Sequence, residues 1–146
     1  MMDELITGVA VNVAVMLVHL SATLTLLALT RPFEKALWKF PHARVTFALL
    51  TANVILLSAH LIEVGIWGGV YGYLGLVSNP GDAYYSAFVN YTTLGYGDVL
   101  QATRTRLLGP MAAGSGIMMF GWSTALLIYV LQSHLPHLLG ARREAP

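Results

Sequence analysis

Three long apolar runs divide the chain, and they predict its main elements. Residues 5–29 contain no Lys, Arg, Asp or Glu, and the same holds for residues 107–131. The run between them in the chain, residues 45–67, is interrupted only by His60 and Glu63. Each run reaches the roughly 20 residues that an α-helix needs to cross the bilayer core. The pattern therefore predicts an all-α membrane protein with three transmembrane helices.

The segment between the second and third spans has a different pattern. It is rich in glycine and tyrosine, and it contains Ser78-Asn79-Pro80, where Ser78 or Asn79 can cap a helix and Pro80 suits its first turn. Residues 81–92 are mostly apolar or aromatic but too few to cross a membrane. We expect a re-entrant half-helix here, followed by non-helical backbone that must be buried in protein or line a cavity.

Composition agrees with a membrane protein. The chain is 56% hydrophobic and 10% charged, whereas soluble domains carry about 25% charged residues. The net charge of +1 gives no reason to expect a nucleic-acid partner. The chain has no cysteine, so it has no disulfide or thiolate metal site. We find no nucleophile elbow, phosphate loop or pair of catalytic acids, and we expect no enzymatic activity.

The distribution of charge predicts the orientation in the membrane. The loop at residues 31–44 is strongly positive and should be cytoplasmic, because Lys and Arg accumulate on that side. Arg142 and Arg143 place the C-terminus there too, which leaves the N-terminus outside. A secretory signal peptide is the alternative for the first run, but the residues before it, Asp3 and Glu4, are acidic rather than basic.

The candidate chemistry lies in Thr92-Thr93-Leu94-Gly95-Tyr96-Gly97-Asp98. Glycine adopts left-handed dihedrals that other residues avoid. Alternating left- and right-handed residues can turn successive carbonyl groups toward the same side. Four such strands around an axis would stack rings of oxygens that replace the water shell of a cation.

This segment resembles the signature filter of the tetrameric pore-loop potassium channels, with Leu94 where Val or Ile is commoner. The order of span, half-helix, filter and span over about residues 45–132 is similar to the pore module of that family. The resemblance implies a homotetramer. It also implies that K+ binds to the backbone carbonyls of Thr93, Leu94, Gly95 and Tyr96 and to the Thr93 hydroxyl, with Gly97 and Asp98 at the outer mouth.

The resemblance also assigns residues that support the filter. Thr92 ends the pore helix and leads into the filter, and the Tyr96 hydroxyl is expected to reach Tyr84, Tyr85 or a neighbouring chain. Some members place an acid as partner to the filter aspartate at the position of Val89. Inactivation that depends on this carboxyl pair is therefore not expected here.

The third span carries candidates for gating. Gly116 and Gly121 are hinge candidates, although small residues also allow close helix packing, which we favour for Gly121. One helical face is interpreted as the wall of a water-filled cavity, with Ile128 as a possible hydrophobic constriction; packing on the second span is the alternative. That face consists of Ile117, Phe120, Thr124, Ile128 and Gln132.

Polar residues within the spans have competing interpretations. Glu63 is expected near the outer interface in contact with solvent, with His60 one turn deeper and able to hydrogen-bond to it. For His19 we favour an interhelix hydrogen bond over a sensing role. His134 and His137 are placed in a solvated cytoplasmic tail. The other hypothesis is that their protonation below about pH 6.5 opens the pore.

The resulting organisation is an N-terminal transmembrane helix at 1–30, a basic loop at 31–44, a pore module at 45–132 and a short tail at 133–146. The pore module comprises an outer helix at 45–68, a pore helix at 80–92, a filter at 93–98 and an inner helix at 106–132. No voltage-sensor helix and no soluble ligand domain are expected.

These features predict a multi-pass subunit of the plasma or inner membrane that conducts K+ passively and needs no cofactor other than the K+ ions in its filter. One alternative is a weakly selective cation channel on the same scaffold. The other is a non-conducting membrane interaction subunit.

Overall fold

The computed structural model describes residues 1–36, 40–99 and 105–138. These parts of the chain are helical and contain no strand. In chain order the helices are α1 (Met2–Ala36), α2 (Pro41–Tyr73), α3 (Pro80–Tyr91) and α4 (Leu108–Leu138). Three of them contain segments that are long and apolar enough to cross a membrane: Met2–Thr30, Pro41–Tyr73 and Leu108–His134. The expected all-α class and its three spans are confirmed.

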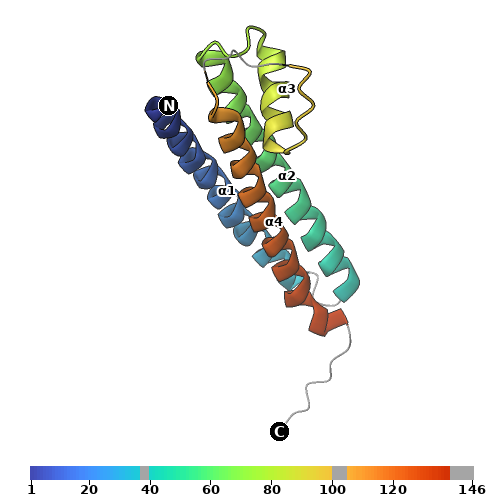
Figure 1. Ribbon diagram of the computed structural model, residues 1–146. Coiled ribbons are helices and arrows are strands. Elements are labelled where there is room, and N and C mark those ends of the chain that lie inside the picture. Colours follow the sequence, from blue (N-terminus) through green and yellow to red (C-terminus); the bar gives the residue numbers. More distant parts are fainter. Residues whose placement is uncertain (37–39, 100–104, 139–146) are drawn as a thin grey trace.

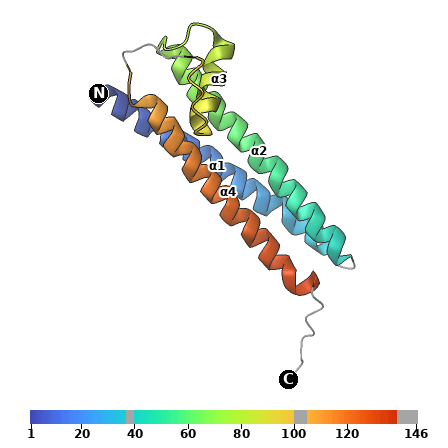
Figure 2. The ribbon, with the colours of Figure 1, turned by 45° about the vertical axis from the view of Figure 1, so that its right-hand side comes forward.

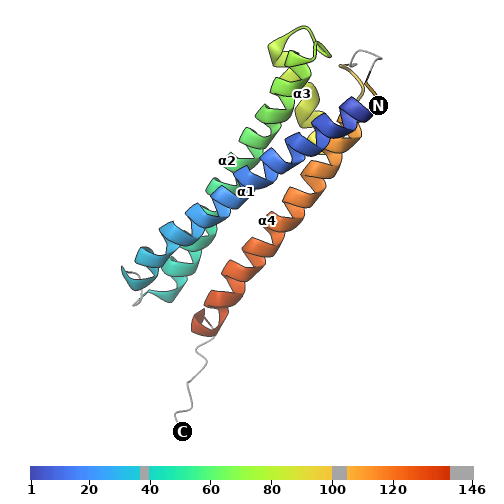
Figure 3. The same cartoon turned by 90° about the vertical axis from the view of Figure 1, so that its left-hand side faces the viewer.

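The long helices α1, α2 and α4 lie side by side, and the short helix α3 lies against one end of this bundle (Figure 1). That end contains the start of α4 and the N-terminus (Figures 1 and 2). After a quarter turn about the vertical axis, α1 is seen to cross in front of α2 and α4 (Figure 3). The end that carries α3 is therefore where all four helices can contribute side chains to one site.

Local sequence explains where α3 begins and why α2 ends. Asn79 caps α3, its side-chain oxygen accepting the Gly81 N–H at 2.8 Å, and Pro80 occupies the first turn. Gly75 terminates α2 with a φ of 65°. Its N–H bonds to the Gly72 carbonyl, and the Leu76 N–H bonds to the Tyr71 carbonyl at 2.9 Å. This pair of bonds satisfies carbonyl groups that a helix end otherwise leaves unpaired.

Several helix ends differ from the sequence prediction. The stretch 31–44 was expected to be a loop, but α1 continues to Ala36 and α2 already begins at Pro41. The stretch from residue 133 was expected to be a tail, but α4 continues to Leu138. Hydropathy marks the part of a helix that crosses the membrane, whereas the helical hydrogen bonds continue into the polar flanks.

Buried apolar residues form two clusters along the bundle. At the α3 end, large side chains such as Trp67, Tyr71 and Leu108 are fully buried together with residues of all four helices. Toward the other end a smaller cluster joins the three long helices through Leu26, Ala52 and Val130. The larger core surrounds α3 and holds it against the bundle.

Helix α1 packs against α2 and α4 of its own chain. The contact with α4 is close at Gly8, where an added Cβ would overlap the Met111 side chain. The Glu4 carboxylate accepts the N–H groups of Arg106 at 2.9 Å and Leu107 at 3.1 Å. A side-chain acceptor at this place satisfies N–H groups that the start of a helix leaves free. Helix α1 thus supports the first turn of α4.

Candidate functional site

The C-terminal end of α3 holds the first residues of the predicted filter. Thr92 is the C-cap, with its hydroxyl donating to the Phe88 carbonyl at 2.8 Å. The next two N–H groups also bond back to the helix, Thr93 to Asn90 and Leu94 to Val89, both at 2.9 Å. The last turn of α3 therefore fixes where the filter backbone departs. The negative end of the helix dipole lies at the same place and favours a cation there.

The backbone of the filter alternates in handedness. Thr93, Gly95 and Gly97 have φ values of 61°, 60° and 70°, whereas Leu94 and Tyr96 between them have negative φ. This is the alternation that the sequence predicted. Among the described residues Thr93 is the only one other than glycine with positive φ. Because left-handed backbone costs an L-residue about 1–2 kcal/mol, the strain at Thr93 marks a functional segment.

The filter residues are exposed in the single chain. Leu94 is 53% exposed and Tyr96 is 66% exposed. The segment from Thr93 to Asp98 contains no helix or strand. Irregular backbone cannot face lipid, because its polar groups would lack hydrogen-bond partners. The segment therefore requires a surrounding of protein or a water-filled cavity that one chain does not supply.

Tyrosines of α3 make the supporting contacts, but with different partners from those expected. Tyr85 donates a hydrogen bond to the Asp98 carboxylate at 2.7 Å, and this bond holds the pKa of Tyr85 above its ordinary value. Tyr84 donates to the Leu61 carbonyl on α2 at 3.2 Å. Tyr96 was expected to reach Tyr84, Tyr85 or a neighbouring chain. Its side chain is exposed in the single chain, so the contact with a neighbouring chain stays a prediction. Asp98 thus has the phenol of Tyr85 as its partner.

Val89 lies behind the filter. It lines a pocket of about 270 Å³ together with Gly95 and Gly97 of the filter and Gly109 at the start of α4. Val89 is 7% exposed. Its apolar side chain lies at the position where the sequence analysis noted that an acid is missing. The support of Asp98 therefore comes from Tyr85, four residues earlier on α3.

The two hinge candidates of α4 have opposite surroundings. Gly116 lies directly against the end of α3, where an added Cβ would overlap the Tyr91 carbonyl oxygen. Gly121 has no atom within 4 Å of the position of a Cβ. Close packing, which we favoured for Gly121, is therefore observed within the chain at Gly116. The hinge role of both glycines stays a prediction.

The predicted cavity face of α4 points away from the chain's own helices. The exposed fraction is 63% for Ile117 and 49% for Ile128, and Thr124 and Gln132 are also exposed. Phe120 differs, because its ring lies 4.5 Å from that of His60 on α2, measured between centroids. Most of this face is thus exposed in the single chain and could line a cavity or contact another chain, whereas Phe120 packs against His60 of α2.

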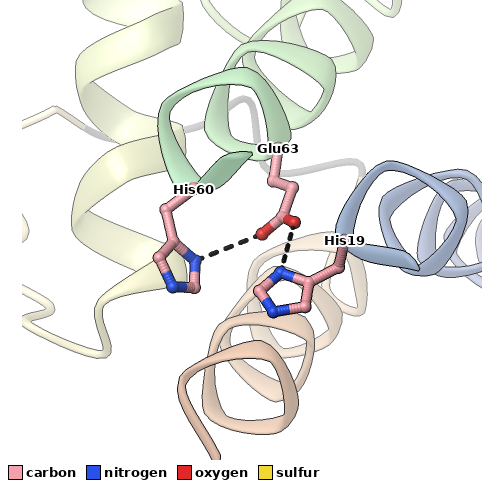
Figure 4. A group of neighbouring side chains, drawn as sticks. All are labelled: His19, His60 and Glu63. Atoms are coloured by element: carbon pink, nitrogen blue, oxygen red, sulfur yellow. Dashed lines mark hydrogen bonds and ion pairs between the residues drawn. The ribbon is translucent and has the colours of Figure 1, made fainter. Parts of the chain in front are cut away.

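A second polar site lies inside the bundle, below the end of α3 and away from the filter. His19 on α1 and His60 on α2 both point toward the carboxylate of Glu63 on α2 (Figure 4). The His19 Nδ1 atom lies 2.8 Å from Oε1, and the His60 Nδ1 atom lies 3.2 Å from Oε2. His19 and Glu63 are both 0% exposed.

This site confirms two sequence expectations and overturns a third. His19 does make an interhelix hydrogen bond, and His60 does bond to Glu63. Glu63 was expected to be solvated, and that was wrong. Glu63 is buried because residues of α1 and α3 cover the face of α2 from which it projects.

Two further residues complete the cluster, which we call the buried polar cluster: His19, His60, Glu63, Tyr91 and Ser123. The Tyr91 hydroxyl, at the end of α3, donates to Glu63 Oε2 and lies 2.9 Å from His60 Nδ1. The Ser123 hydroxyl on α4 lies 2.9 Å from His60 Nε2 and 3.3 Å from His19 Nε2. Sequence reasoning missed Tyr91 and Ser123, whose only signal was a polar atom within or beside an apolar helix.

His134 on α4 is not in a solvated tail. His134 is 4% exposed, and its Nδ1 atom lies 2.7 Å from the Val130 carbonyl one turn earlier. His137 belongs to α4, and its side chain lies outside the described residues. This contact holds the His134 ring against its own helix. The hypothesis that protonation of the two histidines opens the pore stays a prediction.

Comparison with known proteins gives one result. A family model described as ion channel matches residues 59–133, which run from the end of α2 through α3 and the filter to α4. No match to the chain was found among curated proteins or among solved structures.

Proposed function

The chain belongs to the ion channel family, since more than half of it matches the family model, and we propose that within this family it is a potassium-selective channel subunit. Four copies would surround a central axis and conduct K+ passively down its electrochemical gradient. The carbonyl groups of Thr93, Leu94, Gly95 and Tyr96 would bind the ion, and the Thr93 hydroxyl would add oxygens at the inner end.

The observation that carries this proposal is the alternation of positive φ at Thr93, Gly95 and Gly97 directly after α3. Alternating handedness directs successive carbonyl groups to one side, which is what a ring of ion ligands requires. The exposure of the same segment in a single chain supports assembly with other copies. One filter segment per chain implies four chains for a fourfold ring.

The proposal includes an orientation in the cell membrane. The N-terminus lies beside the start of α4, at the end of the bundle that carries α3 (Figure 1). The basic residues Arg31 and Lys35 near the end of α1 and Arg44 near the start of α2 belong to the opposite end. By the positive-inside rule, the filter end and the N-terminus would face outward and the C-terminus would face the cytoplasm.

Ion flux into vesicles tests the function. Purified protein in lipid vesicles should pass K+ in preference to Na+, should be blocked by Ba2+ and should show a reversal potential set by K+ in mixed salt. Gly95→Ala should abolish the flux, because Gly95 has a φ of 60°. Gly69→Ala is the matched control, since Gly69 is helical and a Cβ there would meet no atom within 4 Å.

The possible outcomes separate the proposal from its rivals. Equal currents of K+ and Na+ would make the protein a weakly selective cation channel on the same scaffold. Absence of flux from correctly folded protein would favour a non-conducting membrane subunit. If Gly95→Ala still conducts K+, the predicted filter is not the path that the ions take.

A further inference from the structure

We propose that the buried polar cluster is a binding site for a divalent transition-metal ion, for which Zn2+ is the probe, and that His19, His60 and Glu63 are its ligands. Each of these residues offers one ligand atom, and the three atoms lie within 4.8 Å of one another. This site is separate from the filter and takes no part in conduction, so it goes beyond the proposed function.

The donor set suits such an ion. Two imidazole nitrogens and one carboxylate are common protein ligands of Zn2+ and of related first-row divalent ions. The Tyr91 hydroxyl, 2.9 Å from His60 Nδ1 and bonded to Glu63, is the nearest fourth donor.

The hydrogen positions provide the strongest argument. Without a metal ion, both Nδ1 atoms must carry protons to bond to Glu63. If both rings are neutral, the two Nε2 atoms are then acceptors that compete for the single proton of Ser123. With a metal ion at the Nδ1 atoms, both Nε2 atoms carry protons, and the two lone pairs of Ser123 Oγ accept both of them.

The observed distances agree with that second arrangement. Ser123 Oγ lies 2.9 Å from His60 Nε2 and 3.3 Å from His19 Nε2. Histidines that bind metal ions usually donate their other N–H to an oxygen that orients the ring. Ser123 would orient both rings at once. A single protonated histidine would also satisfy the network, and the metal analysis described below distinguishes the two cases.

The location of the cluster suggests what the ion would do. Its ligands come from α1 and α2, the fourth donor from α3 and the orienting hydroxyl from α4. Tyr91 is the last residue of α3 and directly precedes the segment from Thr92 to Asp98. A bound ion would therefore hold α1 and α2 to the base of the pore helix. Because the ligands are almost fully buried, the ion would enter during folding and exchange slowly.

Metal content of the purified full chain tests the inference. Protein produced with added Zn2+ and then dialysed should contain one zinc ion per chain. Glu63→Gln and His19→Gln should lower the content at least about tenfold, and Ser123→Ala should weaken binding about 10–100-fold without removing a ligand. His42→Gln is the matched control, because His42 is exposed and lies outside the cluster.

X-ray absorption spectra of the zinc-loaded wild-type protein provide a readout that does not depend on the folding of a variant. They should show imidazole nitrogens at about 2.0 Å from the zinc. Wild-type protein without zinc, zinc without imidazole ligands, or unchanged zinc in a folded Glu63→Gln variant would each overturn the inference. Metal content is measured without ion flux, so failure of the channel proposal leaves this result unaffected, and the reverse is also true.

Discussion

The filter and the buried polar cluster lie at the two sides of the same helix end, and they are built in opposite ways. The filter is one continuous segment, from Thr92 to Asp98, whose proposed ligands are mainly backbone carbonyl groups. The cluster brings together side chains that lie as far apart in sequence as His19 and Ser123. The filter is exposed in the single chain, whereas His19 and Glu63 are fully buried.

This difference teaches what each region needs from the rest of the molecule. The filter needs backbone conformations that glycine permits, and it needs neighbours to cover it. The cluster is complete within one chain, but it exists only if α1 packs against the other helices. Tyr91 joins the two regions, since its hydroxyl belongs to the cluster and its backbone directly precedes Thr92 and the predicted filter.

The largest expected effect comes from removing the centre of the cluster. Glu63→Ala leaves two buried histidines and Tyr91 without their common acceptor, and breaking a buried pair of this kind costs about 3–5 kcal/mol. Thermal or denaturant unfolding in detergent would measure the loss of stability. Asp98→Ala is the control, because Asp98 is exposed and belongs to the filter. Equal losses for the two variants would contradict the contrast between buried and exposed carboxylates.

A smaller loss is expected where α4 meets the end of α3. Gly116→Ala introduces a methyl group that overlaps the Tyr91 carbonyl oxygen. Overpacking of this kind costs about 1–3 kcal/mol and should displace the cluster and the filter together. The same unfolding measurement on Gly121→Ala should show little change, because a Cβ there meets no atom within 4 Å. If both variants unfold alike, the close approach at Gly116 is not a tight contact.

Replacing a filter glycine with alanine is expected to lower the free energy of unfolding by about 1 kcal/mol. Gly97 has a φ of 70°, and alanine is disfavoured by roughly that amount in left-handed backbone. Gly97→Ala should therefore lower stability slightly but reduce ion flux strongly. Gly72→Ala, which is helical and has open space at the Cβ position, should leave both unchanged. If Gly97→Ala lost much stability but kept normal flux, the filter would contribute to folding rather than to conduction.

The smallest effect on stability is expected at the edge of the filter. Tyr85→Phe removes the phenol that donates to Asp98 at 2.7 Å, and both residues are exposed. The unfolding midpoint should stay unchanged, while the ratio of K+ to Na+ flux should fall because Asp98 loses its partner. Zinc content should also stay at the wild-type value. An unchanged flux ratio would show that this hydrogen bond does not support the filter.

Several parts of this protein were determined by sequence alone, because their causes are local. Apolar length predicted the three spans, Asn79-Pro80 predicted the start of α3, and the glycines at 95 and 97 predicted alternating handedness. Each of these depends on residues that are neighbours in the chain. The match of residues 59–133 to the ion channel family covers α3, both glycines and parts of α2 and α4, but not α1.

Only the tertiary structure decided the surroundings of the polar side chains. Position along α2 placed Glu63 near an interface, but hydropathy does not tell which face of a helix its neighbours cover. The packing of α1 and α3 buries Glu63 and brings His19, Tyr91 and Ser123 to it. It also gives Asp98 its partner Tyr85, across a turn of non-helical backbone. These contacts join distant parts of the chain, so no local pattern contains them.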